Sequence, residues 1–332
     1  MAEIYHIPAM LKETIEGLAI KPEGVYVDVT FGGGGHSRAI LENLSQTLSS
    51  GEGGKAGHLY SFDQDIEAYH NALNSFPCGE GQDGVTDWTF VHSNFRYLRN
   101  WMDYYGVEQI DGLLADLGVS FHHFDCPERG FSFRFSAPLD MRMNQTAKRT
   151  AADIVNGYSE EELAQIFYLY GELKNGRAIA KAICKARAQK PIERTEELVA
   201  ASLKLKVESL KLKEAGELNI PVNAKKDLAR LFQALRIEVN DEMGALREML
   251  VAARDLLKPG GRIAILTYHS LEDRLVKNFL RSGNLEGKIE KDFYGNILTP
   301  FTLIEKGRVA SDEEVEHNPR ARSAKLRVAE KK

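Results

Sequence analysis

The order of apolar and polar residues along the first third of the chain predicts alternating strands and helices. Residues 25–30 alternate as a half-buried strand does, and residues 37–48 carry apolar side chains at helical spacing. Further strands are predicted at residues 58–63, 88–93 and 111–118, with helical patterns after the first of them and around 95–105. Strands that alternate with helices are typical of a parallel sheet that helices cover on both faces.

The second half of the chain predicts a helical segment inserted into this sheet. The stretch "LLKPGGRIAILTYHS" ends a helix, turns at Pro-Gly-Gly and enters a fifth strand. The chain between Asp116 and Gly261 is far longer than one crossover helix requires. Helical periodicity fills this interval at residues 159–173, 175–190, 194–206 and 224–257, the last of which leads back to the sheet as one long helix. We therefore expect a sheet domain formed by residues 1–120 and 236–332 and an inserted helical subdomain over 121–235.

Composition and charge narrow the class of protein. The chain has 332 residues, of which 43% are hydrophobic, and its formal net charge of -5 argues against a protein that coats nucleic acid by bulk electrostatics. Cys78, Cys126 and Cys184 form no CxxC pair and suggest no disulfide framework, so we expect a reducing, cytoplasmic location. No apolar stretch approaches the ~18 residues of a membrane span, and the N-terminus carries no apolar signal segment.

The first predicted strand runs into four consecutive glycines, "VDVTFGGGGHS", and several nucleotide-site templates compete for this turn. A P-loop fails, because the only candidate Gly-Lys pair is followed by alanine. The dinucleotide fingerprint GxGxxG matches Gly32 and Gly34 but meets Ser37 at its third glycine. The third template is the S-adenosylmethionine turn of methyltransferases, a strand ending in an acid followed by glycine amides that face the ligand; Asp28 and residues 32–35 supply it. A flexible surface turn is the plain alternative.

Polar residues after the next strands favour an adenosyl ligand. Asp63 ends the second strand, where a carboxylate can accept both hydroxyls of a ribose. After the third strand, Asn94 can bond an adenine edge and Phe95 can stack on its face. Asp116 and Ser120 follow the fourth strand, at the edge where open α/β sheets bind ligands. Each residue alone could be an ordinary loop acid or a core ring. Their occurrence in this order on consecutive strands is a more specific sign of an adenosyl site than any one of them.

Several longer segments resemble one known family. They are "YHIPAML" (5–11), "VDVTFGGGGHS" (27–37), "DLGVS" (116–120), "ERGFSF" (128–133), "PLDMRM" (138–143), "YGEL" (170–173), "FQALRIEVN" (232–240), "PGGR" (259–262), "HSLEDR" (269–274) and "NPRARS" (318–323). Through them the chain is similar over nearly its whole length to the ribosomal RNA small subunit methyltransferase H family. The resemblance implies an α/β fold, a Rossmann-like class I methyltransferase sheet of seven mostly parallel strands with an inserted all-helical subdomain. It also implies S-adenosylmethionine-dependent methylation of the exocyclic N(4) of a cytidine in 16S ribosomal RNA.

The resemblance also implies which residues form the site. The family's S-adenosylmethionine contacts fall on Gly34, Gly35, His36, Asp63, Phe95 and Asp116. His123 stands where a cofactor-contacting glutamine is expected, and a histidine makes that hydrogen bond with a shorter reach. Gly33 replaces a residue that is commonly arginine, and Asn144 stands where the family often has aspartate. Neither departure removes an essential part of the site.

The chemistry expected at the fourth strand is proton acceptance. The exocyclic nitrogen of cytosine is a poor nucleophile, and in-line methyl transfer depends on positioning it about 3 Å from the methyl carbon. Asp116 and Ser120 are the catalytic candidates, as acceptors for its protons. A carbon-5 cytosine methyltransferase is an alternative that would need a cysteine nucleophile, and only Cys126 lies near the site in sequence. No metal is expected, because the nine histidines are scattered along the chain and the adjacent pair His122 and His123 would point in different directions.

Binding of RNA is expected to use cations and aromatic rings around an unstacked base. The resemblance favours Asp140, Arg142 and His269 as substrate contacts, and the basic stretch "NPRARSAKLR" adds Arg322 as a candidate. A basic island in the insert is either an RNA contact or a solvated helix face: Arg177, Lys181, Lys185, Arg187, Lys190 and Arg194. The stretch "RGFSFRF" interleaves Arg129 and Arg134 with phenylalanines that either line a base pocket or fill a core.

The expected partner is therefore 16S ribosomal RNA or the small ribosomal subunit, and neither DNA nor a membrane is expected. A homodimer is left open. Two competing interpretations from other classes remain at this stage: a nicotinamide dehydrogenase with a degraded fingerprint, and a non-catalytic RNA-binding module on the same fold.

Overall fold

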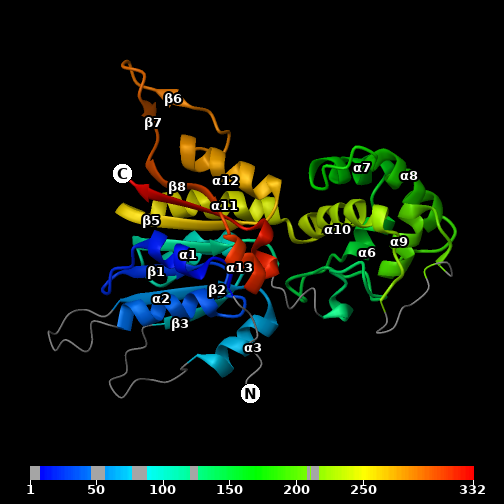
Figure 1. The fold of residues 1–332 in the computed structure, drawn as a ribbon, viewed down its shortest axis with the longest axis horizontal. Coiled ribbons are helices and arrows are strands. Elements are labelled where there is room, and N and C mark those ends of the chain that lie inside the picture. Colours follow the sequence, from blue (N-terminus) through cyan, green and yellow to red (C-terminus); the bar gives the residue numbers. More distant parts are fainter. Residues whose placement is uncertain (1–7, 46–56, 77–87, 120–125, 208–209, 211–216) are drawn as a thin grey trace. The chain divides into compact units, whose positions relative to one another are not determined.

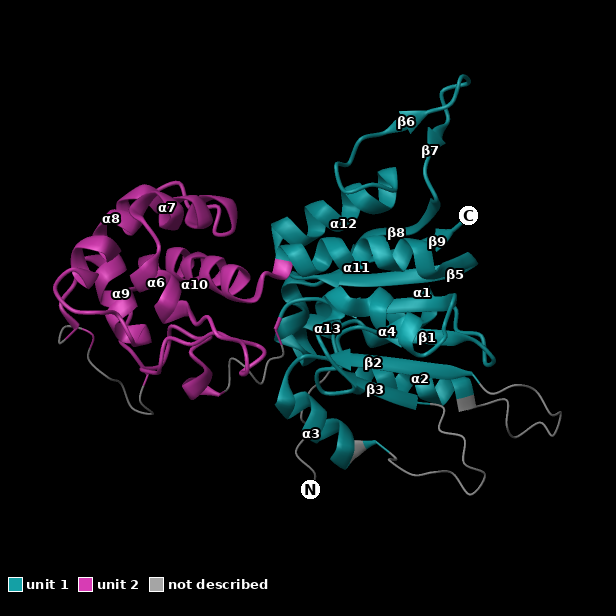
Figure 2. Cartoon of the chain, turned by 180° about the vertical axis from the view of Figure 1, so that it is seen from behind, with its two compact units in different colours: residues 1–118, 243–332 teal, residues 119–242 magenta. Residues whose placement is uncertain are grey.

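The computed structural model of the chain describes residues 8–45, 57–76, 88–119, 126–207, 210 and 217–332 (Figure 1). The chain divides into two compact units, unit 1 with residues 1–118 and 243–332, and unit 2 with residues 119–242 (Figure 2). Each unit has its own hydrophobic core. No helix among the described residues is long and apolar enough to cross a membrane.

A seven-stranded sheet forms the centre of unit 1. Its strands are β1 (Val25–Asp28), β2 (His58–Asp63), β3 (Trp88–His92), β4 (Ile110–Asp116), β5 (Leu257–Thr267), β8 (Phe301–Val309) and β9 (Lys325–Lys331). They follow the order β3-β2-β1-β4-β5-β9-β8, and only β9 runs against its neighbours. The order reverses between β1 and β4, which is the switch point where such sheets bind ligands. The predicted Rossmann-like, mostly parallel sheet is confirmed.

Alternate residues of the central strands are buried on opposite faces of the sheet. Tyr26, Leu114 and Leu266 belong to one core cluster, which they share with residues of α1 (Leu11–Leu18) and α2 (Gly35–Ser45). Their neighbours Val27 and Leu113 are equally inaccessible to solvent. Since side chains alternate along a strand, both faces of the sheet are covered, as expected for parallel strands with helical crossovers.

The remaining helices of unit 1 are α3 (Ile66–Ser75), α4 (Leu98–Tyr104), α11 (Glu242–Leu256), α12 (Ser270–Ser282) and α13 (Asp312–His317), with short 3-10 turns η2 (Phe95–Tyr97) and η7 (Pro319–Ser323). A separate hairpin joins α12 to β8 and consists of β6 (Glu290–Lys291) and β7 (Ile297–Leu298). Both ribbon views show this hairpin projecting away from the sheet (Figures 1 and 2).

The Pro-Gly-Gly turn before the fifth strand differs from its prediction. The sequence predicts a turn that separates helix and strand, whereas β5 begins at Leu257, directly after α11. Its pairing with β4 jumps from Ile110 opposite Leu257 to Gly112 opposite Arg262, so the Pro-Gly-Gly residues form an irregularity inside the strand. Glycine accommodates this because Gly260 adopts a φ of +77°, which other residues rarely adopt.

Unit 2 is helical and packs around its own core. Its helices are α6 (Ala151–Gly157), α7 (Glu160–Leu169), α8 (Gly176–Arg187), α9 (Thr195–Leu203) and α10 (Lys225–Asn240), with a 3-10 turn η3 (Pro127–Arg129) and another, η6 (Val222–Ala224). Thr150 and Ser159 begin α6 and α7 with capping boxes, in which the cap side chain and the third helical residue bond each other's amides. The start of α7 agrees with the helix predicted over residues 159–173, whereas α6 lies outside the predicted helices.

The prediction of one long helix over residues 224–257 is wrong. The chain forms α10 and α11, which are separated at Asp241 by a left-handed φ of +46°. Asp and Asn tolerate this conformation better than most residues. Arg236 fixes the break by donating two hydrogen bonds to Glu242, at 2.8 and 3.0 Å. Hydrophobic periodicity continues across the break, which is why the sequence pattern does not reveal it.

Candidate active site

The carboxyl ends of β1, β2 and β4 bring three acidic residues of the sequence pattern to one edge of the sheet. Asp28, Asp63 and Asp116 end these strands, which run parallel. The loops that follow are tied across the edge: the amide of Phe31 donates to the carbonyl of Phe62 at 2.8 Å. The order of strands thus places the acids side by side at the switch point, as the sequence predicts.

The glycine turn has a fixed shape that glycine alone provides. Gly32 and Gly34 have φ of +52° and +77°. A Cβ on Gly34 would lie 2.5 Å from the Phe76 ring and 2.7 Å from the Phe31 ring. Among the described residues, a Cβ on Gly32 would meet nothing closer than a carbonyl oxygen at 4.0 Å. The described part of the turn is therefore packed tightly beneath Gly34 and open at Gly32, where a ligand can approach the main chain.

Asp63 holds the start of this turn. Its Oδ2 accepts a hydrogen bond from the amide of Gly32 at 2.9 Å, and its Oδ1 accepts one from the amide of Asp65 at 2.9 Å. Asp65 in turn begins α3 as its N-cap, accepting from the amide of Glu67 at 3.0 Å. A carboxylate oxygen has two lone pairs, so Asp63 keeps acceptor capacity for ligand hydroxyls.

Asp28 is a structural acid rather than a ligand contact. It is fully buried, and its carboxylate accepts from the Ser37 hydroxyl at 2.7 Å and from the Thr30 amide at 3.0 Å. Ser37 continues the network to Ser61 at 2.8 Å, and Ser61 accepts from the Trp88 indole. Burial raises the pKa of Asp28 to about 6, against the lowering effect of these hydrogen bonds. The network joins β1, α2 and β2 beneath the glycine turn.

Asp116 lies in the most polar part of the site. Its side chain is 14% exposed, and its Oδ1 accepts a hydrogen bond from the Tyr268 hydroxyl at 2.6 Å. Its Oδ2 lies 3.6 Å from Nδ1 of His36, which is 5% exposed. The Asp116 amide donates to the Thr30 hydroxyl at 2.6 Å. The acid is thus connected both to the glycine turn and to the end of β5.

The pKa of Asp116 is raised to about 7. Burial is the main cause, the Tyr268 hydrogen bond opposes it, and the nearby charges of Asp28 and Glu272 raise the pKa further. Burial beside Asp116 likewise raises the pKa of Tyr268 well above its ordinary value, so the tyrosine remains a hydrogen-bond donor. Asp116 therefore titrates near neutral pH, in the range suited to a group that takes up a proton.

Tyr268 and Thr30 are site residues that the sequence reasoning missed. Tyr268 directly precedes the "HSLEDR" segment, and its position at the end of β5 was the available signal. Its contact with Asp116 follows from strand pairing, because Asp116 lies opposite Leu266 in the β4–β5 ladder. Thr30 lies between the first acid and the glycines, where the sequence pattern predicts only a strand residue.

The segment that follows β3 carries Asn94 and Phe95, the two residues that the sequence predicts as adenine contacts. Asn94 caps η2, its Oδ1 accepting from the Arg96 amide at 2.9 Å, while its Nδ2 donates to Gln64 at 2.9 Å. Phe95 is half-buried and begins η2. Asn94 therefore acts first as a cap, and Phe95 remains partly accessible to solvent.

His269 and Arg322 occupy different kinds of position in unit 1. His269 is the N-cap of α12, and its ring also lies 3.1 Å from the carboxylate of Glu272, which is 5% exposed. Arg322 is exposed on η7. His269 thus has a helix-capping role whether or not it contacts substrate.

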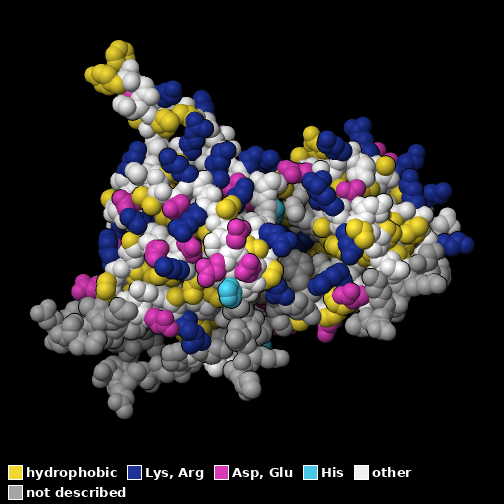
Figure 3. Space-filling model, in the orientation of Figure 1, with side chains coloured by type: hydrophobic (Ala, Val, Ile, Leu, Met, Phe, Trp, Pro, Cys, Tyr) yellow, Lys and Arg dark blue, Asp and Glu magenta, His cyan; other side chains and the backbone are white. Residues whose placement is uncertain are grey.

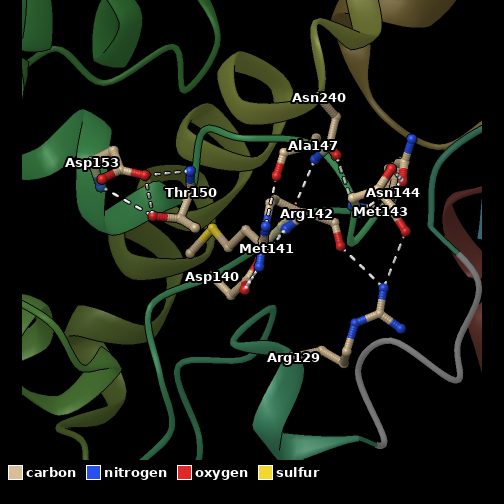
Figure 4. Close-up of polar contacts among 11 residues, drawn as sticks. Arg129, Asp140, Met141, Arg142, Met143, Asn144, Ala147, Thr150, Asp153 and Asn240 are labelled. Carbon is tan, nitrogen blue, oxygen red and sulfur yellow. Dashed lines mark hydrogen bonds and ion pairs between the residues drawn. The ribbon is translucent and has the colours of Figure 1, made fainter.

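Asp140 and Arg142 lie in unit 2 and are bound to each other (Figure 4). Arg142 donates from Nε and Nη2 to the two carboxylate oxygens at 2.8 and 2.7 Å and from Nη1 to the carbonyl of Ala147 at 2.6 Å. Burial would raise the pKa of Asp140, but the Arg142 hydrogen bonds outweigh it and lower the pKa. Arg129 donates to the carbonyls of Arg142 and Met143, so it supports this loop from within.

Of the other predicted RNA contacts, some are buried in the core, some form ion pairs and some are exposed to solvent. Phe131 is buried, and Phe133 packs on Phe232 with ring centroids 5.7 Å apart. Lys190 and Arg194 pair with Glu197 and Glu196. Arg187 bonds the carbonyl of Val155, whereas the exposed face of α8 displays Arg177, Lys181 and Lys185. Gly34, Gly35, His36, Asp63, Phe95 and Asp116 all lie in unit 1, whereas Ser120 and His123 lie outside the described residues.

Comparison with known proteins gives close relatives over the whole chain. The sequence model of the MraW methylase family matches residues 3–332. A protein from Parabacteroides distasonis named ribosomal RNA small subunit methyltransferase H is 56% identical over 98% of this chain and 97% of its own. One of the same name from Phocaeicola vulgatus is 55% identical over 99% of this chain and 98% of its own.

Solved structures are more distant. An rRNA methylase from Streptococcus thermophilus covers 98% of this chain and 98% of its own with 13% identity and a TM-score of 0.39. TrmN from Thermus thermophilus covers 97% of this chain and 48% of its own with 14% identity and a TM-score of 0.36. These similarities are too weak to add to the sheet topology described above.

Proposed function

Because this chain belongs to the MraW methylase family, we propose that it transfers a methyl group from S-adenosylmethionine to the exocyclic N(4) of a cytidine in 16S ribosomal RNA. The observation that carries the proposal is Asp116, a largely buried carboxylate at the switch point with a pKa of about 7. It lies next to the glycine turn through His36 and Thr30. Family membership removes the nicotinamide dehydrogenase interpretation, whereas the carbon-5 alternative depends on Cys126 as its nucleophile.

The cofactor, when bound, supplies a methyl group on a positively charged sulfonium. The residues that would hold it are Gly34, Gly35, His36, Asp63, Phe95 and Asp116, with His123 added by resemblance alone. The glycine turn suits this task, because no side chain of the described residues lies within 4 Å of a Cβ built on Gly32. Asp63 accepts from the turn, and a carboxylate at this position can receive ribose hydroxyls.

The chain's own contribution to the reaction is to orient the base and accept a proton. The ionised Asp116 accepts a hydrogen bond from the cytosine amino group and takes its proton as the new bond forms. Tyr268 holds this carboxylate in place at 2.6 Å and Thr30 holds its main chain. Ser120 is proposed as a second acceptor for the amino group. A positioned acceptor of this kind contributes about 10²–10⁴-fold to a proton-transfer step.

RNA binding is proposed to involve residues of both units. In the insert, expected over residues 121–235, the support is the exposed cationic face of α8 and the ordered loop that carries Asp140 and Arg142. In unit 1, Arg322 is exposed, and His269 begins α12. We place the reaction in the cytoplasm, where ribosomal RNA is found, and a homodimer stays a prediction.

A methylation assay on small ribosomal subunits tests the function. Subunits are taken from a strain without the corresponding gene and incubated with the protein and S-adenosylmethionine, and the nucleosides are then identified by mass spectrometry. We expect one N(4)-methylated cytidine derivative in 16S ribosomal RNA. A carbon-5-methylated product would support the cysteine alternative, and RNA binding without any methylated product would support the non-catalytic module.

Asp63→Ala is expected to weaken binding of S-adenosylhomocysteine about hundredfold. The substitution removes the carboxylate proposed to receive the ribose hydroxyls, and hydrogen bonds to a charged acceptor are worth about 1.5–3 kcal/mol each. It also leaves the Gly32 amide without its carboxylate acceptor. Isothermal titration calorimetry measures the change.

Asp65→Ala provides the matched control for that change. Asp65 is 4% exposed and caps α3 two residues further along the same loop, so its loss costs about 1 kcal/mol of stability. Affinity for S-adenosylhomocysteine should change little. Equal losses of affinity in the two variants would mean that Asp63 acts only by ordering the loop.

Tyr268→Phe is expected to shift the pH dependence of turnover upward by about one pH unit. The tyrosine hydroxyl stabilises the ionised carboxylate, so its removal raises the pKa of Asp116 above about 7. Since the ionised form accepts the proton, activity rises with pH through this pKa. The variant should be slow at pH 7 and recover at higher pH. A profile that coincides with that of the unmodified protein would show that Asp116 does not titrate in the rate-limiting step.

A further inference from the structure

The β6–β7 hairpin carries a pair of aromatic rings at its tip that no described residue of unit 1 covers. Phe293 is 97% exposed and Tyr294 is 86% exposed, with ring centroids 5.7 Å apart. Figure 3 shows the tip as a hydrophobic end on a projecting arm. Exposed aromatic rings gathered at one point are typical of a binding site rather than of an ordinary surface.

The turn that presents these rings is ordered by its own hydrogen bonds. Asp292 accepts from the amide and the side chain of Asn296 at 2.8 and 2.9 Å, and its carbonyl accepts from the amide of Gly295 at 3.0 Å. Gly295 has a φ of +86°, which suits glycine at a tight turn. The rings are therefore held outward by a defined turn, so less conformational entropy is lost when they bind.

The hairpin is also anchored firmly at its base. On the entering side, Asn284 follows the C-cap of α12 and bonds the amide and carbonyl of Lys288 at 2.9 and 2.7 Å. On the returning side, the buried ring of Phe301 packs on Phe279 of α12. The arm is thus positioned relative to α12 rather than hinged loosely on unit 1.

The outer face of α12 beside the arm is cationic. Its exposed charged residues are Arg274, Lys277 and Arg281. The helix's acidic residues face elsewhere: Glu272 is buried, and Asp273 pairs with Arg327 and Lys325 at 2.8 and 3.5 Å. Figure 3 shows Lys and Arg side chains gathered below the arm. The hairpin itself is mixed in charge, with Lys288 and Lys291 against Glu286, Glu290 and Asp292.

We propose that the hairpin tip and the cationic face of α12 form a second RNA contact, in which Phe293 and Tyr294 stack on unpaired bases of the substrate RNA while Lys277 and Arg281 bind the adjoining phosphates. This inference rests on the proposed function, because it takes ribosomal RNA as the substrate. Cations beside aromatic rings bind single-stranded nucleic acid by this combination. A protein partner would need no cationic face on the helix from which the arm projects, so RNA is the occupant that the charges favour.

The test compares variants of the whole protein in binding and turnover on unmethylated small ribosomal subunits. In Phe293→Ala/Tyr294→Ala, loss of base stacking should raise the Kd and the KM for subunits about tenfold. The kcat at saturating subunits and the affinity for S-adenosylhomocysteine should stay unchanged. Lys277→Ala/Arg281→Ala should weaken binding and reduce its salt dependence, because fewer phosphates are neutralised.

Two further variants separate stacking from apolar docking. Phe293→Tyr/Tyr294→Phe keeps both rings and should bind subunits as the unmodified protein does, whereas Phe293→Leu/Tyr294→Leu keeps an apolar tip and should bind as weakly as the alanine pair. Tyr104→Ala, at a residue 76% exposed on α4, is the matched control and should change nothing. Leucine variants that bind normally would indicate a protein partner and overturn the proposal. Alanine variants with an unchanged Kd would also overturn it, while methylation by the unmodified protein would leave the proposed function standing.

Discussion

Asp116→Asn is expected to lower kcat at saturating S-adenosylmethionine by at least about a hundredfold. In the unmodified protein Tyr268 donates to the Asp116 carboxylate at 2.6 Å. The asparagine keeps the shape of the side chain and an oxygen that can accept this hydrogen bond. It loses the ability to take up a proton from the cytosine amino group. The measurement is single-turnover methylation of small ribosomal subunits with the protein in excess, which separates the chemical step from product release.

Asp111→Asn is the control for this experiment, because Asp111 lies on the same strand at its opposite end. Asp111 accepts from Lys258 at 2.6 Å and from the Val25 amide at 3.0 Å, so its substitution removes an ion pair without touching the switch point. We expect lower stability and an unchanged kcat. If Asp116→Asn retained full turnover, proton acceptance would have to be assigned to another group or to solvent.

Much of unit 1 is predictable from sequence because its strands are bounded by local signals. Residues 58–63 form β2 as predicted, since an apolar run there ends in an acid and a helix cap. The break at Asp241 is different. Its left-handed conformation coincides with two hydrogen bonds between Arg236 and Glu242, and no hydrophobic pattern encodes them. Local periodicity predicts helices, whereas the point where one helix ends and another begins depends on tertiary contacts.

The candidate site likewise has features that the sequence predicts and features that it does not. The acids Asp28, Asp63 and Asp116 are predictable because each ends a parallel strand, and such ends meet at one edge. The contact of Asp116 with Tyr268 is not, since it joins residues 152 positions apart and depends on the β4–β5 register. The sequence also does not distinguish an acid that is accessible to a ligand from one whose carboxylate is hydrogen-bonded within the protein interior. Asp28 has the same position in the pattern as Asp63, yet its carboxylate is fully buried and accepts from Ser37 and Thr30, whereas Asp63 is partly exposed.

Gly34→Ala is expected to lower the free energy of unfolding by about 3 kcal/mol and to weaken S-adenosylhomocysteine binding at least tenfold. Two costs add. A left-handed φ costs a residue with a side chain about 1–2 kcal/mol, and overpacking a filled space costs about 1–3 kcal/mol. The new methyl group would lie 2.5 Å from the Phe76 ring, which packs against Phe31 at 5.1 Å and against Trp88 at 4.7 Å. The rings cannot yield independently, so the turn itself must move.

Gly106→Ala separates these two costs. Gly106 also has a left-handed φ, of +69°, but a Cβ there would meet nothing within 4 Å. The variant should lose only the conformational part, about 1–2 kcal/mol, and bind S-adenosylhomocysteine normally. Urea unfolding and calorimetric titration of both variants give the comparison. If Gly34→Ala were no less stable than Gly106→Ala and bound ligand equally well, the glycine turn would be a tolerant surface loop, and the cofactor would have to be held by other parts of unit 1.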